Sequence, residues 1–426
     1  MSKYQAPKGV SEYFPPRSNV FEYVREALIA PAKLAGYSLI ELPVFEDTEL
    51  FERGVGESTD VVSKEMYTFE DRGGRSITLR PEGTAGVMRS VIENNLDRGQ
   101  LPVKVFYAGP FFRAERPQAG RYRQFYQVGI EAIGYNDPEI DAEVIWVADS
   151  AFKSLGLKKF ELQITSLGDS QSRSAHRKEL DKFLSKLPLD AETKRKSELN
   201  PLRLFDDKRP EIIEAMKDAP ILINYLNTES VDNFEKVKKC LSDLDISFSI
   251  NPKMVRGLDY YTGTTFEFVH PMLGAQSGIG GGGRYDGLMN QLGGQDLSGI
   301  GFGIGIDRVV MACEAESSLT QMPAALDLFI VPIGDEAKNY SVKLLKALRD
   351  CGIKVDMAYG DRGLKGGMKS ADKNEATFAL VIGEDEIASG QANLKNMKLG
   401  ENISSTLTAS AIVDLISQQN NAKNKG

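Results

Sequence analysis

The chain has 426 residues, of which 41% are hydrophobic and 26% charged, and its formal net charge is −8. This length predicts two or three domains, and the composition is typical of a globular protein but not of a uniformly basic nucleic-acid binder. No apolar run reaches the roughly 20 residues that span a bilayer. The polar start Met1–Pro7 lacks the apolar core of a secretion signal, so we expect a cytoplasmic protein without a membrane anchor.

The inventory of reactive side chains narrows the possible chemistry. Three cysteines (Cys240, Cys313 and Cys351) lie far apart and form no Cys-x-x-Cys pair, which excludes a disulfide framework and argues against zinc. The histidines are His176 and His270, too few for a zinc-histidine site or a histidine-based triad. Any chemistry must therefore depend on carboxylates, arginines, tyrosines and amides.

The first half of the chain predicts helices around strands. A helix is expected over Asn19–Ala35, followed by a short strand over Tyr37–Leu42. The strand-like runs Val103–Ala108 and Tyr126–Ile133 predict a hairpin with a long charged loop. Asp137 followed by proline predicts the start of a helix, because both residues favour helix N-termini.

The second half divides into three stretches. Residues 160–164 alternate as a strand, and residues 169–249 are polar and helical, which predicts an inserted helical subdomain. After Met322-Pro323, strands alternate with helices, which predicts a small α/β domain with a largely parallel sheet. The expected elements are strands 326–331, 353–357 and 378–382 and helices 337–351, 364–374 and 409–417. The polar tail Gln418–Gly426 is expected to fray.

Arg113, Arg116, Arg121 and Arg123 form a local positive patch in the hairpin loop. Arginines beside strand ends suit bidentate contacts with phosphate oxygens. A solvated, charged hairpin tip is the alternative.

The strand after this loop has an unusual face. Alternation places Gln127, Gly129 and Glu131 on one side, opposite Val128 and Ile130. A glutamine, a glycine and a glutamate in a row suit the floor of a pocket for a small polar ligand. A sheet face exposed to water is the alternative.

Three further segments are rich in glycine, arginine or tyrosine: Arg256–Thr264, Gly280–Gly287 and Gly301–Arg308. They could line a site or decorate turns, and glycine allows close approach of the backbone to a ligand. None contains a dinucleotide-binding or P-loop pattern in a strand-to-helix context.

Together these segments resemble class II aminoacyl-tRNA synthetases of the histidyl family. Arg113–Phe125 is similar to motif 2, Gly301–Arg308 to motif 3, and Asn19–Pro43 to motif 1 of the class. Leu79–Thr84 resembles the amino-acid-binding turn. Arg256–Tyr261 and Gly281–Gly287 resemble the two segments peculiar to histidyl enzymes. The departures from the family pattern are small: Gly263 stands where many relatives carry a larger residue, and Asp307 stands where glutamate is common.

The resemblance implies an α+β fold and a complete reaction. A six-stranded antiparallel sheet flanked by helices, with the insertion at 169–249, would form a catalytic core over residues 1–325. Residues 326–426 would form an α/β anticodon-binding domain. The implied enzyme activates L-histidine with ATP, releases pyrophosphate and loads histidine onto the 3′ end of histidine tRNA. Motif 1 implies a homodimer, and Mg²⁺ would bridge the outer phosphates, with no metal ligand expected from protein side chains.

The resemblance also implies roles for individual residues. Arg113 would hold the α-phosphate and the substrate carboxylate, Arg308 the γ-phosphate, and Arg256 would act from the opposite side of the α-phosphate. Glu131 and Tyr261 would take the two imidazole nitrogens of histidine. The remaining histidine contacts would be Glu82, Gly83, Thr84 and Gln127 near the α-ammonium and Tyr260 and Tyr285 closing the pocket. The acceptor end of the tRNA would meet Arg116, Gln118, Arg121 and Arg123.

Two other functions share this core. One is a catalytically inactive paralogue that regulates ATP phosphoribosyltransferase, which lacks the anticodon domain and the arginines that face ATP and tRNA. The other is a non-catalytic RNA-sensing module fused to other domains. The retained arginines and the α/β domain after residue 325 favour the synthetase.

Overall fold

The computed structural model describes residues 4–56, 59–320, 322, 324–360 and 362–423. The chain forms two compact units, Met1–Thr320 and Gln321–Gly426. Pro323, part of the expected boundary between domains, lies outside the described residues.

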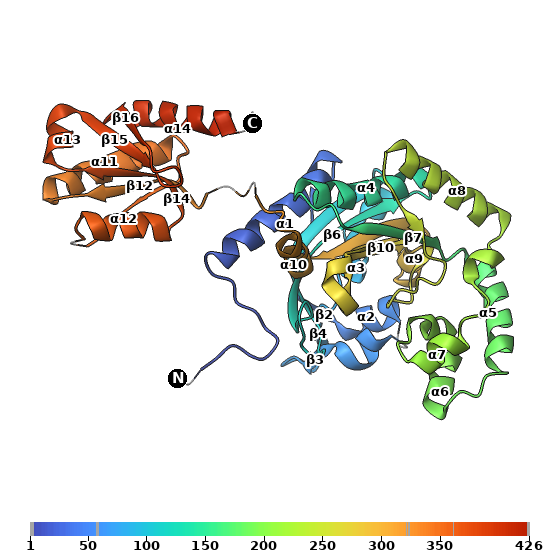
Figure 1. The fold of residues 1–426 in the computed structure, drawn as a ribbon. Coiled ribbons are helices and arrows are strands. Elements are labelled where there is room, and N and C mark those ends of the chain that lie inside the picture. Colours follow the sequence, from blue (N-terminus) through green and yellow to red (C-terminus); the bar gives the residue numbers. More distant parts are fainter. Residues whose placement is uncertain (1–3, 57–58, 321, 323, 361, 424–426) are drawn as a thin grey trace. The chain divides into compact units, whose positions relative to one another are not determined.

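A large twisted sheet organises the first unit (Figure 1). Within the described residues its strand order is β1-β5-β6-β11-β10-β9-β7-β8, and the six inner strands are antiparallel, which confirms the expected central sheet. The inner strands are β5 (Val103–Phe112), β6 (Gln124–Gly134), β11 (Ser298–Gly305), β10 (Gly278–Arg284), β9 (Thr262–Val269) and β7 (Glu161–Ser166). Two short strands, β1 (Ser38–Leu39) and β8 (Ser249–Ile250), pair in parallel at the edges.

The strand predicted over Tyr37–Leu42 is therefore too long. The chain leaves β5 after the amide of Ile40 donates to the carbonyl of Phe106 at 2.9 Å. The carbonyls of Leu42 and Pro43 accept from Nη1 of Arg80 at 2.8 and 3.2 Å instead. A buried guanidinium thus replaces the next strand as the partner of this backbone.

One face of the sheet carries the main apolar core. The helices α1 (Arg17–Leu34), α4 (Pro138–Ser154) and α10 (Ile306–Glu316) contribute buried residues to it. Val128 and Ile130 of β6 point into this core and are fully buried. The alternation of a strand directs Gln127, Gly129 and Glu131 to the other face.

Shorter elements cover that other face. They are a three-stranded sheet of β2 (Phe45–Asp47), β4 (Ser76–Leu79) and β3 (Tyr67–Glu70), the helices α2 (Thr48–Val55), α3 (Thr84–Glu93) and α9 (Leu288–Gln291), the π-helical turn Val61–Glu65 and the 3₁₀ turn Leu96–Arg98. The space between these elements and the large sheet holds the site described below.

The polar stretch between β7 and β8 is helical. It contains α5 (Ser170–Leu184), α6 (Ala191–Leu199), the 3₁₀ turn η3 (Pro201–Asp206), α7 (Pro210–Ala215), the 3₁₀ turn Leu222–Tyr225 and α8 (Thr228–Asp243). Leu180 of α5, Leu204 of η3 and Ile212 of α7 share a small core of their own. By contrast, Phe234 and Val237 of α8 pack into the main core.

The second unit has its own sheet and core. The strands β12 (Leu326–Pro332), β13 (Val355–Met357) and β14 (Ala376–Ile382) are parallel, and β15 (Gln391–Asn396) and β16 (Asn402–Thr406) extend them in antiparallel fashion. The helices are α11 (Asp335–Asp350), α12 (Leu364–Lys373), α13 (Glu384–Ser389) and α14 (Ala409–Lys423).

The expected α/β domain is confirmed, but its sheet is more mixed than predicted. β15 alternates buried Ala392 and Leu394 with exposed polar residues, a weak apolar signal in sequence. The tail expected to fray from residue 418 continues α14 to Lys423, because Ile412 and Ile416 anchor that helix in the core. Residues 424–426 lie outside the described residues.

A buried ion pair ties the sheet to the start of α4. Arg284, at the end of β10, is 1% exposed. Its Nε donates to Oδ2 of Asp141 at 3.1 Å, and its Nη2 forms an ion pair with Oδ1 at 2.5 Å. Nη1 donates to Ser298 Oγ at 2.8 Å and to the carbonyl of Tyr135 at 3.3 Å, and Nη2 donates to the carbonyl of Asp137 at 3.1 Å. Each nitrogen of this guanidinium therefore has at least one hydrogen-bond acceptor.

We predict that Asp141→Ala lowers the free energy of unfolding of the first unit by about 3–5 kcal/mol. The variant removes the buried partner of the Arg284 charge, and Asp286, at 3.8 Å and 39% exposed, is too distant to replace it. Urea unfolding of both proteins measures this difference. Asp243→Ala, which breaks the exposed Lys239–Asp243 pair on α8, is the matched control and should cost less than about 0.5 kcal/mol. If both variants lose the same free energy of unfolding, the buried pair contributes no more to stability than the exposed one, and the prediction is wrong.

Candidate active site

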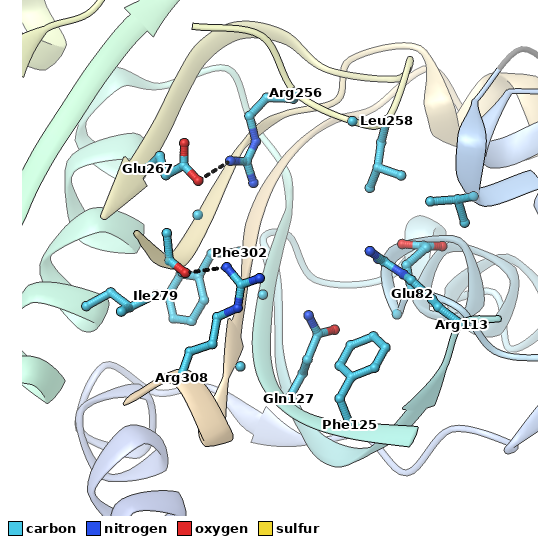
Figure 2. A pocket seen from close by; sticks show the side chains of 18 of the residues that line it. Glu82, Arg113, Phe125, Gln127, Arg256, Leu258, Glu267, Ile279, Phe302 and Arg308 are labelled. Carbon is cyan, nitrogen blue, oxygen red and sulfur yellow. Dashed lines mark hydrogen bonds and ion pairs between the residues drawn. The ribbon is translucent and has the colours of Figure 1, made fainter. Parts of the chain in front are cut away.

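A cavity of about 630 Å³ lies over the polar face of the large sheet. Its lining combines glycines of β10 and β11 with arginines, tyrosines and carboxylates from other elements (Figure 2). It brings together most of the residues predicted to act: Glu82, Gly83, Thr84, Arg113, Arg121, Gln127, Arg256, Tyr260, Tyr261, Tyr285 and Arg308. Glu131 is not itself a lining residue, but it lies directly behind the lining, bonded to the hydroxyl groups of Thr84, Tyr107 and Tyr285, which do line the cavity.

Glycines create the room for the polar groups. A Cβ atom on Gly301 of β11 would lie 1.9 Å from Oε2 of Glu131 on the neighbouring strand. A Cβ on Gly129 would lie 2.3 Å from the ring of Tyr107. Real atoms do not approach so closely, so only glycine at these positions permits a carboxyl group and a tyrosine ring beneath the cavity.

Glu131 is a buried acid with three hydroxyl donors. It is 1% exposed and accepts from Thr84 Oγ1 at 2.9 Å, Tyr285 Oη at 2.7 Å and Tyr107 Oη at 3.3 Å. Burial raises the pKa of Glu131 to about 8, although hydrogen bonds from Tyr285 and Thr84 oppose the shift. Near neutral pH this group can therefore gain or lose a proton when a polar ligand arrives.

The carboxylate of Glu82 stabilises the start of helix α3. Its carboxylate accepts the amides of Thr84 at 2.7 Å and Ala85 at 2.9 Å, which closes the exposed amide end of α3. Tyr260 Oη lies 3.4 Å from the same carboxylate. Burial raises the pKa of Glu82, and the helix amides and Arg113 oppose that shift.

Aromatic rings close one end of the cavity. The ring centroids of Tyr260 and Tyr261 are 4.7 Å apart, and those of Tyr260 and Tyr285 are 6.0 Å apart. Burial raises the pKa of each of these hydroxyls, so all three remain neutral hydrogen-bond donors at physiological pH. Gly83 allows the ring of Tyr107 to pack beside them, since a Cβ at residue 83 would lie 2.4 Å from that ring.

Besides Arg121, the arginines Arg113, Arg256 and Arg308 line the cavity, each from a different part of the chain. Figure 2 shows Arg113 beside Glu82 on one side and Arg256 and Arg308 on the other. Arg256 Nη1 lies 3.6 Å from Glu267 Oε1, and its guanidinium lies 5.5 Å from the ring centre of Tyr261.

The other two guanidinium groups are oriented by backbone carbonyls. Arg113 Nε donates to the carbonyl of Pro81 at 3.0 Å. Arg308 donates through Nε to the carbonyl of Gly120 at 3.0 Å and through Nη1 to that of Gly278 at 2.6 Å. The carbonyls orient both groups, and guanidinium groups oriented in this way suit bidentate binding of an anionic ligand.

The arginines of the hairpin loop between β5 and β6 differ in their surroundings. Arg116 is exposed, and Arg121 pairs with the buried carboxylate of Glu115 at the cavity wall. Arg123 instead donates to the carbonyls of Glu115 at 3.2 Å and Lys8 at 3.5 Å, which ties the loop to the start of the chain. Gln118 is exposed, and its backbone pairs with Arg121 in the tight turn.

The two positions where the chain departs from the family pattern keep the site intact. Asp307 is buried, and its carboxylate accepts a hydrogen bond from the hydroxyl of Tyr13 near the start of the chain. Gly263 adopts φ +41° in β9 and lies against the side chain of Arg284, where a Cβ would meet Cδ at 3.2 Å.

Several cavity residues had no signal in the sequence. Tyr107 contacts Glu131, Glu267 faces Arg256, and Glu115 pairs with Arg121. Tyr107 pairs directly with Gly129 across β5 and β6, so the hairpin register could have identified it. Asp206 and Lys208, from the helical segment between β7 and β8, also line the cavity, and only the three-dimensional fold brings them there.

Within the described residues, no group of three or more His, Cys, Asp or Glu side chains is arranged to hold a metal ion. Among the helices of that same part of the chain, none is long and apolar enough to cross a membrane.

Comparison with known proteins agrees with this geometry. The family model described as histidyl-tRNA synthetase matches residues 9–309, and the model described as anticodon binding domain matches residues 327–419. Proteins named histidine–tRNA ligase from Saccharopolyspora erythraea and Rhodococcus erythropolis are 60% and 62% identical to the chain. Each alignment covers 94% of this chain, and 96% and 95% of those proteins. The crystal structure of apo histidyl-tRNA synthetase from S. aureus matches with a TM-score of 0.78 at 38% identity, over 97% of this chain and 99% of that one.

An antiparallel sheet with a glycine-lined floor and convergent arginines defines the catalytic core of a class II aminoacyl-tRNA synthetase. Within that class, the chain belongs to the histidyl-tRNA synthetase family.

We predict that Glu131→Gln gains stability relative to the parent protein as pH rises. The pKa of Glu131 is raised from 4.5 to about 8, so between these values the folded state keeps a proton that the unfolded state has lost. The parent protein therefore loses stability as pH rises through this window, by about 1.4 kcal/mol for each unit of pKa shift, and the glutamine variant does not.

Unfolding by urea at about pH 5, 6, 7 and 8 tests this sign. Glu235→Gln, at an exposed position of α8, controls for the removal of a carboxylate and should show no such trend. Parallel stability profiles for parent and Glu131→Gln would show that Glu131 is not held protonated by burial.

Proposed function

We propose that this chain is a histidine–tRNA ligase: it activates L-histidine with ATP to histidyl-adenylate and pyrophosphate, then transfers histidine to the 3′ end of histidine tRNA. The observation that carries the proposal is the buried Glu131, which is bonded to Thr84 and Tyr285 of the lining of a cavity that Arg113, Arg256 and Arg308 also line. Relatives about 60% identical over most of their length carry the name of this activity.

Activation requires the histidine carboxylate to attack the α-phosphate of ATP as pyrophosphate leaves. Negative charge builds at the phosphate during this step, so catalysis depends on positioning and on charge neutralisation. Arg113 would hold the α-phosphate and the substrate carboxylate, and Arg308 the γ-phosphate. Arg256 would act at the opposite side of the α-phosphate. Their fixed guanidinium groups around one cavity support this division.

Histidine would bind with its imidazole toward Glu131 and Tyr261 and its ammonium toward Glu82, Thr84 and Gln127. Imidazole has two polar nitrogens, so a site that hydrogen-bonds both leaves buried partners unpaired with an apolar competitor. Tyr260 and Tyr285 would close the pocket around the ring, with Gly83 giving the backbone room at the turn.

Mg²⁺ would enter on the outer phosphates of ATP. The side chains here fit an ion that is bound by ATP, because the phosphate side of the cavity presents arginines, which do not bind cations. The nearby carboxylates Glu115 and Glu267 face Arg121 and Arg256. The ion would add positive charge at the phosphates, and the protein side chains would not supply its ligands.

The remaining assignments concern transfer RNA and assembly. Arg116, Gln118 and Arg121 would meet the acceptor end at the mouth of the cavity, and Arg123 would hold the loop in place. Residues 1–325 would form the catalytic core with residues 169–249 as its insertion, and residues 326–426 would bind the anticodon. We propose a cytoplasmic homodimer.

The regulatory paralogue of histidine biosynthesis has less support. It would lack the C-terminal domain, whereas residues 327–419 match the anticodon-binding model. The three cavity arginines and their carbonyl anchors are also retained.

We predict that histidine alone among the amino acids supports rapid ATP–pyrophosphate exchange, and that Glu131→Ala reduces this exchange by at least about 100-fold. ATP binding should be largely kept, since the arginines are unchanged. Glu161→Ala, at an exposed position of β7, is the matched control and should exchange normally. Rapid exchange with another amino acid would refute the proposed specificity, and an active Glu131→Ala would remove Glu131 from imidazole recognition.

We predict that a chain ending near Ala324 still activates histidine but charges tRNA poorly. Every proposed ATP and histidine contact precedes that residue, and each unit has its own apolar core. Pyrophosphate exchange and tRNA charging would be measured after circular dichroism has established folding. Charging as efficient as that of the full chain would contradict an anticodon role for the C-terminal unit.

A further inference from the structure

The helical segment between β7 and β8 contacts the loop Arg256–Tyr261, here called the catalytic loop. Arg173 of α5 donates to the carbonyl of Tyr261 at 3.2 Å, and a second set of contacts meets the carboxylate of Asp259. Asn200 Nδ2 donates to Asp259 Oδ1 at 3.0 Å. Arg203 Nη2, from the 3₁₀ turn η3, lies 3.7 Å from the same oxygen, and its Nη1 lies 3.8 Å from Asp60 Oδ2. The contact of Asn200 with Asp259 joins residues 59 positions apart in the chain, and Arg203 also reaches Asp60, far earlier in the sequence.

Asp259 is also held from the catalytic side. Its amide donates to the carbonyl of Val55 at 3.3 Å, at the end of α2. Gly56, with φ +100°, lies so close that a Cβ there would be 2.9 Å from Oδ2 of Asp259. The preceding residue, Leu258, packs against the buried cluster that contains Phe51 and Val55. Asp259 therefore joins α2, the catalytic loop and the helical segment at one point.

The arginine in this contact is held in a partly dry environment. The Arg203 side chain is 23% exposed, and within the part of the chain that the structure describes its Nε and Nη2 are buried without hydrogen-bond partners. Asp259 and Asp60 are its charged neighbours. Burial of such a cation is costly unless carboxylates stay close, so the charge favours the arrangement in which η3 remains against Asp259.

The same turn approaches the chemistry directly. Asp206, at the end of η3, and Lys208 just after it line the cavity. Asp259 is bonded covalently to Tyr260, whose hydroxyl lies 3.4 Å from both Glu82 and Thr84. Arg256 is three residues before Asp259 in the same loop, so a movement of the loop backbone at Asp259 would also move Tyr260 and Arg256.

We infer that Asp259 is a positioning residue through which Asn200 and Arg203 of the helical segment orient the loop carrying Arg256, Tyr260 and Tyr261. The inference rests on the proposed function, because the effect is expressed in histidine activation. It assigns the helical segment a part in adenylate formation itself. A small displacement of reacting groups is sufficient for a large loss of rate, even when no contact with substrate is removed.

The test is the double variant Asn200→Ala/Arg203→Gln in the full-length chain. We expect kcat for ATP–pyrophosphate exchange to fall roughly tenfold and KM for histidine to rise, with KM for ATP nearly unchanged, because Arg113 and Arg308 lie outside the loop. Arg203→Lys, which keeps the charge, should recover most of the activity. Asp259→Asn combined with Arg203→Gln should lose no more than either single variant, as expected for one shared interaction.

Arg209→Gln is the matched control. It removes an arginine–carboxylate pair, Arg209 with Asp207 at 2.6 Å, that lies wholly within the helical segment. Thermal unfolding of both variants shows whether they are equally folded. If Arg203→Gln is unstable, Asn200→Ala decides, because it removes the hydrogen bond to Asp259 and keeps the Arg203 charge. Its kcat should still fall below that of Arg209→Gln.

Kinetics of the double variant that match Arg209→Gln would overturn the positioning role. An equal rise in both KM values, with kcat unchanged, would do the same. Failure of the proposed function is distinguishable, because the parent protein would then show no exchange with histidine at all.

Discussion

The site depends on the space that glycine leaves in the middle of a sheet. Neighbouring strands lie about 4.8 Å apart, and side chains normally fill the layer above them. Gly129 and Gly301 have no side chain to fill that layer. The ring of Tyr107 therefore lies over Gly129, and the carboxyl group of Glu131 lies over Gly301. Burying an acid is costly, but three hydroxyl donors around Glu131 offset part of the cost. The apolar face of the same strands anchors this polar arrangement to the core through Val128 and Ile130.

A second constraint acts on the arginines. The chain is acidic overall, with a net charge of −8, yet its cavity must attract a polyphosphate. The fold achieves this by aligning Arg113 and Arg308 on backbone carbonyls, which fix the direction of each guanidinium group at the cavity. Where a carboxylate is present, as with Glu267 near Arg256, it lies at 3.6 Å and does not form a close bidentate pair. The fixed positions of these arginines therefore matter more for binding a polyphosphate than the negative net charge of the whole chain.

Much of this could be predicted from sequence, for identifiable physical reasons. The period of a strand is two, so the polar face of Gln127, Gly129 and Glu131 follows from local pattern alone, and the structure confirms it. The arginine and glycine segments were recognised because they resemble a family, not because spacing defines a pocket. Tyr107 was missed because its role depends on strand register, which pairs it with Gly129 across a loop of unpredicted length. β15 and β16 were missed because their apolar signal is short and half of their residues are polar.

The carboxylate of Glu82 has two uses at once, and this restricts how the protein can vary. It receives the first amides of α3 and also faces the ligand cavity. A replacement that altered recognition at this position would also remove the cap from a helix whose buried residues form part of the core around Tyr107 and Tyr285. The start of α3 and the polar lining of the cavity thus depend on the same two oxygen atoms. A substitution at residue 82 preserves the start of this helix only if another group accepts the amides of Thr84 and Ala85.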